Sequence, residues 1–247
     1  MNKTVLITGA TGGIGSCLVK ELASKGYNIV INYNNSNQKA NKLAYEINMR
    51  KVSQAIAIKA NVKDRKEVNN LFDIALGSFN NIDVLVNCAG KNLDKPFLEM
   101  SDHEWNEVQS IILKGTFNCS QEFALRYKGN NGHIINIGAL TAIKGRKNGA
   151  NYCSARAGVL NLSKCMAQEL APSIRVNSIT PGWINTSEVM ERYKLFNQEI
   201  YEQILKTIPM KRLGTPEDVS KMISFMICDS TYITGQNFLV DGGMLMY

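Results

Sequence analysis

The sequence predicts an α/β fold, a single doubly wound domain in which helices cover both faces of a parallel seven-stranded sheet. Two observations predict it. Short apolar runs of strand length alternate with amphipathic stretches of helical length along the chain, which is the pattern of successive βαβ units. These apolar runs have no polar face, and this is typical of strands that are buried on both sides of a parallel sheet.

The expected elements are read in chain order. We expect strands at residues 5–7, 29–31, 55–58, 84–86, 134–137, 175–179 and 238–240. We expect helices at residues 14–25, 38–49, 67–76, 103–127 and 151–170. No linker or repeat interrupts this pattern, so the 247 residues are interpreted as one domain, 1–247. The least regular segment, residues 183–209, follows a strand end and is interpreted as a lid over a pocket.

The composition argues against several classes of protein. Hydrophobic residues make up 45% and charged residues 20%, as in ordinary globular proteins. No apolar run approaches the roughly 20 residues of a membrane span, and no hydrophobic leader precedes the first expected strand, so membrane and secretory segments are not expected. Two histidines and six cysteines, without a CxxC pair, predict no metal site and favour a cytoplasmic location.

The chain carries a formal net charge of +7. It has no long basic run and no alternation of basic and aromatic residues, so a nucleic-acid partner is not expected. The positive charge suits an anionic partner, such as a phosphopantetheine carrier protein, an acyl thioester of coenzyme A or NADP.

A glycine-rich turn follows the first expected strand. After Thr8 the chain reads Gly-Ala-Thr-Gly-Gly-Ile-Gly, and the first expected helix begins within this run. Glycines let such a turn tighten and let the backbone approach a pyrophosphate, while the helix N-terminus offers free N–H groups and a partial positive charge. The turn is therefore interpreted as a phosphate site formed by Gly9, Thr11, Gly12, Gly13, Ile14 and Gly15.

Several motifs resemble those of one family. The turn is similar to the TGxxxGxG fingerprint of the short-chain dehydrogenase/reductase (SDR) family, Asn87-Cys88-Ala89-Gly90 to its NNAG, and Tyr152 to the tyrosine of its YxxxK. Pro181-Gly182 and Thr186 match the family's PG turn and the threonine after it. Two further segments resemble the C-terminal part of 3-oxoacyl-[acyl-carrier-protein] reductases, at residues 212–219 and 234–243. The resemblance implies a Rossmann-type NAD(P)-dependent oxidoreductase that assembles as an oligomer.

The end of the second expected strand bears on the choice of cofactor. It reads Asn32-Tyr33-Asn34-Asn35-Ser36 and lacks the carboxylate that holds the ribose 2′-hydroxyl in NAD enzymes. Amides and a hydroxyl suit a 2′-phosphate, so the sequence favours NADP(H) over NAD(H), although Gly12 stands where NADP-dependent relatives often carry arginine. The resemblance implies further cofactor contacts from Asn61 and Val62 beside the adenine, and from Asn87, Ala89, Gly90, Tyr152, Arg156, Pro181, Gly182, Ile184 and Thr186.

The resemblance also shows gaps in the catalytic set. Family members reduce a ketone with a tyrosine, a lysine four positions later, a serine and an asparagine, which together provide acid catalysis and bind the carbonyl oxygen. The tyrosine matches Tyr152, but the lysine position holds Arg156, the serine position Ala139 and the asparagine position Ile112. Arginine keeps the charge, but its planar fork differs in shape and reach from an ammonium group.

Two other hydroxyls are candidates for the role of the missing serine. Thr141 lies two residues after Ala139, and Ser154 lies two residues after Tyr152. The unbroken spacing to Tyr152 argues against Thr141, and a two-residue step on a helix turns Ser154 to another face.

These gaps leave three hypotheses open. The first is a catalytically impaired or inactive SDR, including a supporting subunit in a mixed oligomer with a catalytically complete SDR. The second is an NADP-dependent ketoreductase that acts on an acyl or polyketide thioester through a variant site. The third is a non-redox acid/base enzyme that uses Tyr152. The resemblance implies a homo-oligomer or a mixed oligomer, and an acyl thioester is a candidate ligand.

Overall fold

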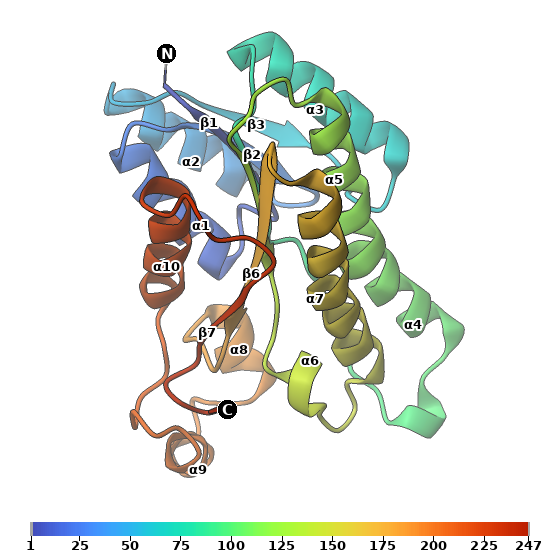
Figure 1. Cartoon of the computed structure of the whole chain (residues 1–247). Helices are drawn as coiled ribbons and strands as arrows, with labels where there is room; N and C mark the ends of the chain where they lie inside the picture. The colour runs from blue at the N-terminus through green and yellow to red at the C-terminus, as the bar shows by residue number, and fades with distance from the viewer. Residues whose placement is uncertain (1, 247) are drawn as a thin grey trace.

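The computed structural model describes residues 2–246 and confirms the α/β architecture (Figure 1). Seven strands form one sheet in the order β3-β2-β1-β4-β5-β6-β7, and each neighbouring pair is parallel. The seven apolar runs of the sequence all become strands, which are β1 (Thr4–Thr8), β2 (Asn28–Tyr33), β3 (Ala55–Lys59), β4 (Val84–Asn87), β5 (Gly132–Ile137), β6 (Ile174–Pro181) and β7 (Asn237–Val240).

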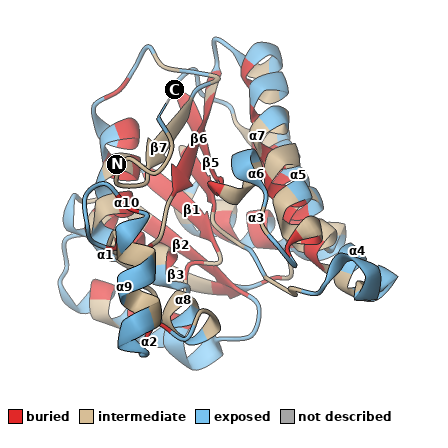
Figure 2. Cartoon of the chain, turned by 90° about the horizontal axis from the view of Figure 1, so that it is seen from below, coloured by how far each residue is buried: buried red, intermediate tan, exposed pale blue. Residues whose placement is uncertain are grey.

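Helices cover both faces of the sheet. One face is covered by α1 (Gly13–Ser24), α2 (Asn37–Met49) and α10 (Pro216–Cys228), and the other by α3 (Arg65–Phe79), α5 (Gly115–Arg126) and α7 (Ala150–Leu170). An apolar core lies on each face of the sheet. Alternate residues of β1 contribute to the two cores, since Val5 and Ile7 belong to one and Leu6 to the other. Figure 2 shows most of the sheet as a buried layer between helices whose outer sides are exposed, while β7 at the edge of the sheet is half-buried.

The order of the strands reverses between β1 and β4. From β1 the chain builds the sheet outward to β3, and it then returns to the other side of β1 and builds outward to β7. The connections that leave β1 and β4 therefore diverge to opposite faces, which opens a crevice at the carboxyl ends of these strands.

Three stretches differ in detail from the sequence prediction. The expected helix 103–127 is α4 (Asp102–Gln109), a π turn (Ser110–Lys114) and α5, and within it the Thr116 hydroxyl donates to the Ile112 carbonyl at 2.7 Å. Residues 216–228 form α10, which the sequence analysis did not propose. The lid segment, residues 183–209, contains two helices, α8 (Ser187–Arg192) and α9 (Gln198–Lys206).

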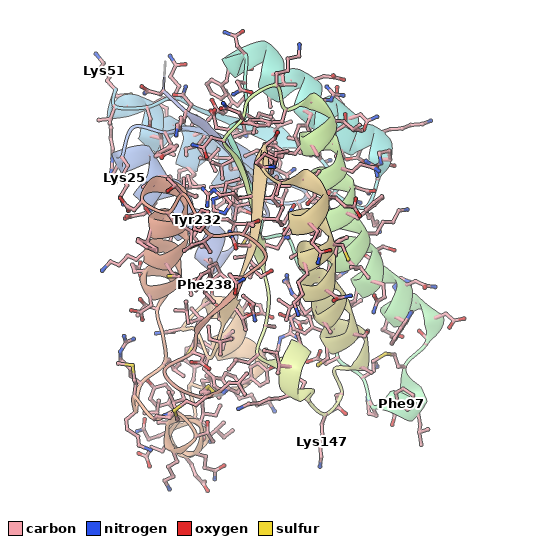
Figure 3. The ribbon with its side chains drawn as sticks, viewed as in Figure 1. Lys25, Lys51, Phe97, Lys147, Tyr232 and Phe238 are labelled. Atoms are coloured by element: carbon pink, nitrogen blue, oxygen red, sulfur yellow. The ribbon has the colours of Figure 1, made fainter. Side chains whose placement is uncertain are left out.

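The remaining elements are short. They are the single-turn η1 (Phe97–Glu99) and α6 (Thr141–Lys144). Phe97 points away from the body of the molecule at the end of the α4 arm (Figure 3), and 76% of it is exposed. Within residues 2–246, no helix combines the length and the apolar character needed to cross a membrane.

His133 lies at the buried, amino-terminal end of β5. It is 1% exposed, with Nδ1 3.2 Å from Nη2 of Arg175 and Nε2 3.1 Å from Nδ2 of Asn177. Burial and the Arg175 charge lower the pKa of His133 from 6.5 to about 3. The folded protein therefore holds this imidazole neutral at pH values where the unfolded chain protonates it.

We predict that His133 makes the stability depend on pH. Because its pKa is lowered in the folded state, its contribution is complete above pH 6.5 and is lost progressively as the pH falls toward 3. Each unit in this range costs about 1.4 kcal/mol of unfolding free energy. Urea denaturation between pH 7 and 5 should show this slope. His133→Gln should flatten it, and the matched variant of the exposed His103, His103→Gln, should retain it. An equal slope in all three proteins would refute the assignment.

Candidate active site

The glycine turn is held against the end of β4 by direct backbone contact. Gly9 has φ +60°, and a Cβ there would lie 2.8 Å from the Ala89 Cα. The Thr8 hydroxyl accepts the N–H groups of Cys88 and Ala89 at 3.1 and 3.2 Å. Glycine is thus required at residue 9 both by its backbone conformation and by the approach of the neighbouring chain. These contacts place the N-terminus of α1 beside the crevice between β1 and β4.

A cavity of about 800 Å³ runs along the carboxyl edge of the sheet at this crevice. Most residues that the sequence predicted as cofactor contacts line it, from the glycine turn at one end to the α7 tyrosine at the other. They are Gly9, Thr11, Gly12, Gly13, Ile14, Gly15, Asn34, Asn35, Ser36, Asn61, Val62, Ala89, Gly90, Tyr152, Arg156, Pro181, Gly182, Ile184 and Thr186.

Two of the residues predicted as cofactor contacts do not line the cavity. Tyr33 packs in the core, and its hydroxyl donates to Oδ1 of Asn37. Asn87 is 3% exposed and its side-chain amide donates to Ser120 Oγ and Asn136 Oδ1, at 3.0 and 2.8 Å. Alternate residues of a strand point to opposite faces of the sheet, so a residue near the cavity can turn its side chain away from it. The side chains of Tyr33 and Asn87 do so, and they hold the ends of β2 and β4 in place.

The end of β2 presents neutral polar groups to the cavity. Asn34, Asn35 and Ser36 line it and are exposed, while the Asn32 amide is turned inward and donates to the Ala60 carbonyl at 3.0 Å. The carboxylates that line the cavity among the described residues, Glu107 and Glu188, belong to α4 and α8 and not to the segment that follows β2. A ribose 2′-phosphate would meet amides and a hydroxyl there.

Tyr152 and Arg156 lie one turn apart on α7 and both line the cavity. Arg156 is 5% exposed, its Nη1 donates to the Ile137 carbonyl at 2.6 Å, and its Cζ lies 5.4 Å from the centroid of the Tyr152 ring. Its Nε is buried and has no hydrogen-bond partner within residues 2–246. A buried guanidinium without a carboxylate partner is costly, so this group fits a polar or anionic ligand in the cavity.

The two side chains that the sequence aligns with the serine and the asparagine of the catalytic set are apolar. Ala139 is 9% exposed and lines the cavity. Ile112 is fully buried and lies in a small cluster with Val108, Ala155 and Val159, against which Tyr152 packs. Neither side chain offers a hydrogen bond to a carbonyl oxygen or to a relay water.

The two alternative hydroxyls are placed differently. Ser154 Oγ donates to the Ala150 carbonyl and accepts from Nε2 of Gln109, both at 2.7 Å, and it does not line the cavity. Thr141 does line the cavity, but its Oγ1 is enclosed by protein and has no partner among the described residues. Ser154 is thereby removed as a candidate.

The sequence analysis missed a second arginine beside the tyrosine. Arg146 Cζ lies 5.1 Å from the centroid of the Tyr152 ring, and its guanidinium donates to both carboxylate oxygens of Asp94. Arg192, in the lid segment, donates to the same carboxylate at 3.1 Å. No local signal reveals this cluster, because its members come from three separate segments of the chain.

A strand order that reverses at a glycine turn, with a tyrosine in the adjoining cavity, defines an α/β protein of the Rossmann dinucleotide-binding type. A family model described as enoyl-(acyl carrier protein) reductase matches residues 9–245. The chain therefore belongs to the short-chain dehydrogenase/reductase family.

The relatives point to one kind of SDR. The chain is 38% identical to the 3-oxoacyl-[acyl-carrier-protein] reductase FabG of Staphylococcus epidermidis, over 100% of both chains. It is 39% identical to the 3-oxoacyl-[acyl-carrier-protein] reductase of Synechocystis sp., over 99% of this chain and 98% of that one. The crystal structure of an SDR described as a glucose/ribitol dehydrogenase, from Brucella melitensis, superposes with a TM-score of 0.92 at 28% identity, covering 100% and 98% of the two chains.

We predict that Gly9→Ala destabilises the fold more than an equivalent change elsewhere. Gly26 is the control, because it also has positive φ (+86°) but a Cβ there meets no atom within 4 Å. Gly26→Ala should cost about 1–2 kcal/mol of unfolding free energy from the backbone conformation alone. Gly9→Ala should cost about 1–3 kcal/mol more, since its methyl group displaces Ala89. Thermal or urea unfolding measures both, and equal costs would contradict the close contact.

Proposed function

We propose that this chain binds NADP(H) in the cavity and is a catalytically impaired ketoreductase. Its reduction of 3-oxoacyl thioesters would be far slower than that of an SDR with all four catalytic residues. The observation that carries the proposal is the contrast between the two halves of the cavity. The glycine turn and its neighbours are complete, while Ala139 and Ile112 leave the tyrosine without polar neighbours at two positions.

The residues present fit a nicotinamide dinucleotide. The first turn of α1 leaves the N–H groups of Gly13 and Ile14 without partners in the helix, and both residues line the cavity. Asn34, Asn35 and Ser36 are placed for the 2′-phosphate. The orphaned guanidinium of Arg156 is placed for the ribose next to the nicotinamide. When bound, the nicotinamide would supply the hydride.

The chain's own residues would supply the proton and the charge. Tyr152 would be the proton donor; it lines the cavity, and the Arg156 guanidinium lies close to its ring. The missing serine hydroxyl is the main loss, because removing one oxyanion donor typically costs about 10²–10³ in rate. The side chains packed around Ile112 are apolar, so they would give no polar support to a proton relay behind the tyrosine.

A second candidate role is that of a supporting subunit in an oligomer. The outer surfaces of α4 and α5 expose large apolar side chains, which are Trp105, Phe117 and Leu125. Tyr232, beyond α10, is also fully exposed. Such residues suit burial against another subunit, either a second copy or a catalytically complete SDR. The six free cysteines suit the reducing cytosol, where we place the protein.

We predict that NADP(H) binds more tightly than NAD(H), by about tenfold or about 1.4 kcal/mol. Asn34→Asp should reverse the preference, because a carboxylate at the exposed end of β2 repels a 2′-phosphate and accepts a 2′-hydroxyl. Asn131→Asp, an exposed change of the same charge outside the cavity, is the control and should leave the ratio unaltered. Titration calorimetry measures all three. Absence of binding at millimolar cofactor would refute the assignment.

We predict that restoring the catalytic set raises the rate only as a group. Ala139→Ser, Ile112→Asn and Arg156→Lys together should increase kcat/KM for a 3-oxoacyl thioester by at least about 10²-fold, as expected for regained oxyanion binding. Each single change should give far less, because residues that act as one unit do not contribute additively.

Two controls accompany this series. Ile112→Asn places an amide in an apolar cluster, so its unfolding free energy must be measured alongside the rate. Adding Tyr152→Phe to the triple variant should abolish the regained activity. Wild-type turnover as fast as that of a complete relative would contradict the proposed impairment.

A further inference from the structure

Tyr193 brings a second tyrosine hydroxyl to the cavity from the lid segment. It follows α8 directly, it is half-buried, and it lines the same cavity as Tyr152. Its ring packs edge-on against Trp183, with centroids 4.6 Å apart and an interplanar angle of 80°. This packing belongs to a small apolar cluster that joins the lid segment to Leu213 and Met244, and this cluster fixes the position of the ring.

The hydrogen-bonding state of this hydroxyl makes it a donor. Arg146 Nη1 donates to the Tyr193 hydroxyl oxygen at 3.0 Å. Within residues 2–246 no acceptor takes the hydroxyl's own proton, although the side chain faces a cavity. Burial raises the pKa of Tyr193 above its usual value, so the proton is retained at neutral pH. The group is therefore set to donate one hydrogen bond to a ligand.

Arg146 links the two tyrosines. Its guanidinium lies over the Tyr152 ring, with Cζ 5.1 Å from the centroid, while its Nη1 reaches the Tyr193 hydroxyl. The neighbouring Lys147 points away from the molecule below α6 (Figure 3), whereas Arg146 turns inward. A cavity ligand that reaches the Tyr152 ring is consequently also close to the Tyr193 hydroxyl.

Arg146 itself is fixed firmly. Its Nη1 and Nη2 groups donate to both oxygens of Asp94, to Oδ1 of Asn92 and to Tyr193, which uses four of its five N–H bonds. Gly149 makes room for its stem, since a Cβ there would lie 2.8 Å from both Cγ and Nε of Arg146. Because most of its N–H groups already donate to the protein, Arg146 is suited to position Tyr193 rather than to bind the ligand itself.

We propose that Tyr193, positioned by Arg146, donates a hydrogen bond to the substrate carbonyl oxygen and so replaces in part the serine hydroxyl that does this in other SDRs. This inference rests on the proposed ketoreductase function. Thr141 is the competing hydroxyl, but its Oγ1 is enclosed by protein, whereas Tyr193 lines the same cavity as Ala139 and Tyr152. The residual activity of the chain would then depend on a residue of the lid segment.

The test is Tyr193→Phe, with Tyr201→Phe as the matched control. Tyr201 belongs to the same lid-segment cluster but does not line the cavity. The probe is acetoacetyl-coenzyme A labelled with ¹³C at the ketone carbon, bound together with NADP⁺ so that no reduction occurs. A hydrogen bond to the ketone moves this resonance downfield. We expect Tyr193→Phe to lose at least half of that shift and Tyr201→Phe to keep it.

Kinetics provides the second readout. Tyr193→Phe should lower kcat/KM for acetoacetyl-coenzyme A by about 10–100-fold, with NADPH affinity within about twofold of wild type. Adding Ala139→Ser to Tyr193→Phe should rescue the rate, because the two hydroxyls serve the same oxygen. Gly149→Ala, which displaces Arg146, should reproduce part of the loss of shift.

The outcomes separate the two proposals. If Tyr193→Phe leaves both the ¹³C shift and the rate unchanged, the role of Tyr193 is wrong, while the proposed impaired function still stands. The same conclusion follows if Thr141→Val loses the shift and Tyr193→Phe does not. If the wild-type protein turns over as fast as an SDR with all four catalytic residues, the proposed impairment is wrong. The ¹³C shift would still show whether Tyr193 donates a hydrogen bond to the ketone. Failure of the labelled thioester to bind at millimolar concentration would overturn the role of Tyr193.

Discussion

The site depends on one close contact, where the backbone at Gly9 meets the backbone at Ala89. This contact joins the ends of β1 and β4, the two strands between which the sheet order reverses. The Thr8 hydroxyl strengthens the junction by accepting two N–H groups that would otherwise be left at the end of β4. With the turn held there, α1 starts at the crevice, and the cavity extends from its N-terminus to the residues of α7. Any side chain at residue 9 would separate these parts.

The sequence predicted the sheet well because a parallel strand buried on both faces leaves a simple apolar pattern. It predicted less well where side-chain direction or distant contacts decide the structure. Tyr33 and Asn87 lie at strand ends near the cavity, yet their side chains turn to the core and to neighbouring elements. The π turn at Ile112 interrupts a continuous helical pattern, and Gly115, which follows it directly, lies within the helix rather than at its end. The cluster of Asp94, Arg146 and Tyr193 joins residues about 50 to 100 positions apart, so periodicity and spacing contain no trace of it.

Two cations flank Tyr152 in the cavity. The Tyr152 ring lies within 5.5 Å of two guanidinium carbons, those of Arg146 and Arg156, while Ala139 and Ile112, which the sequence aligns with the serine and the asparagine of the family, are apolar. Arg146 has Asp94 as a counter-ion, but Arg156 has none among the described residues. An uncompensated buried charge costs several kcal/mol unless a partner arrives. A cavity ligand that accepts a hydrogen bond from Arg156 would offset part of this cost, so ligand binding would stabilise this half of the molecule.

The lid segment is tied to the same carboxylate that holds Arg146. Asp94 accepts from Arg146, which precedes α7, and from Arg192, which ends α8. Movement of the lid segment away from the cavity would break the Arg192 bond and carry the Tyr193 hydroxyl away from Arg146.

In other SDRs the serine lies at the end of a strand, so its hydroxyl is in place whether or not a lid covers the cavity. A hydroxyl from the lid segment is in place only when the segment is docked. If Tyr193 supplies the carbonyl hydrogen bond, completion of the site and closure over the ligand become one event. A substrate must then stabilise the docked lid segment as well as fit the cavity, and this requirement lowers the rate while narrowing the range of ligands.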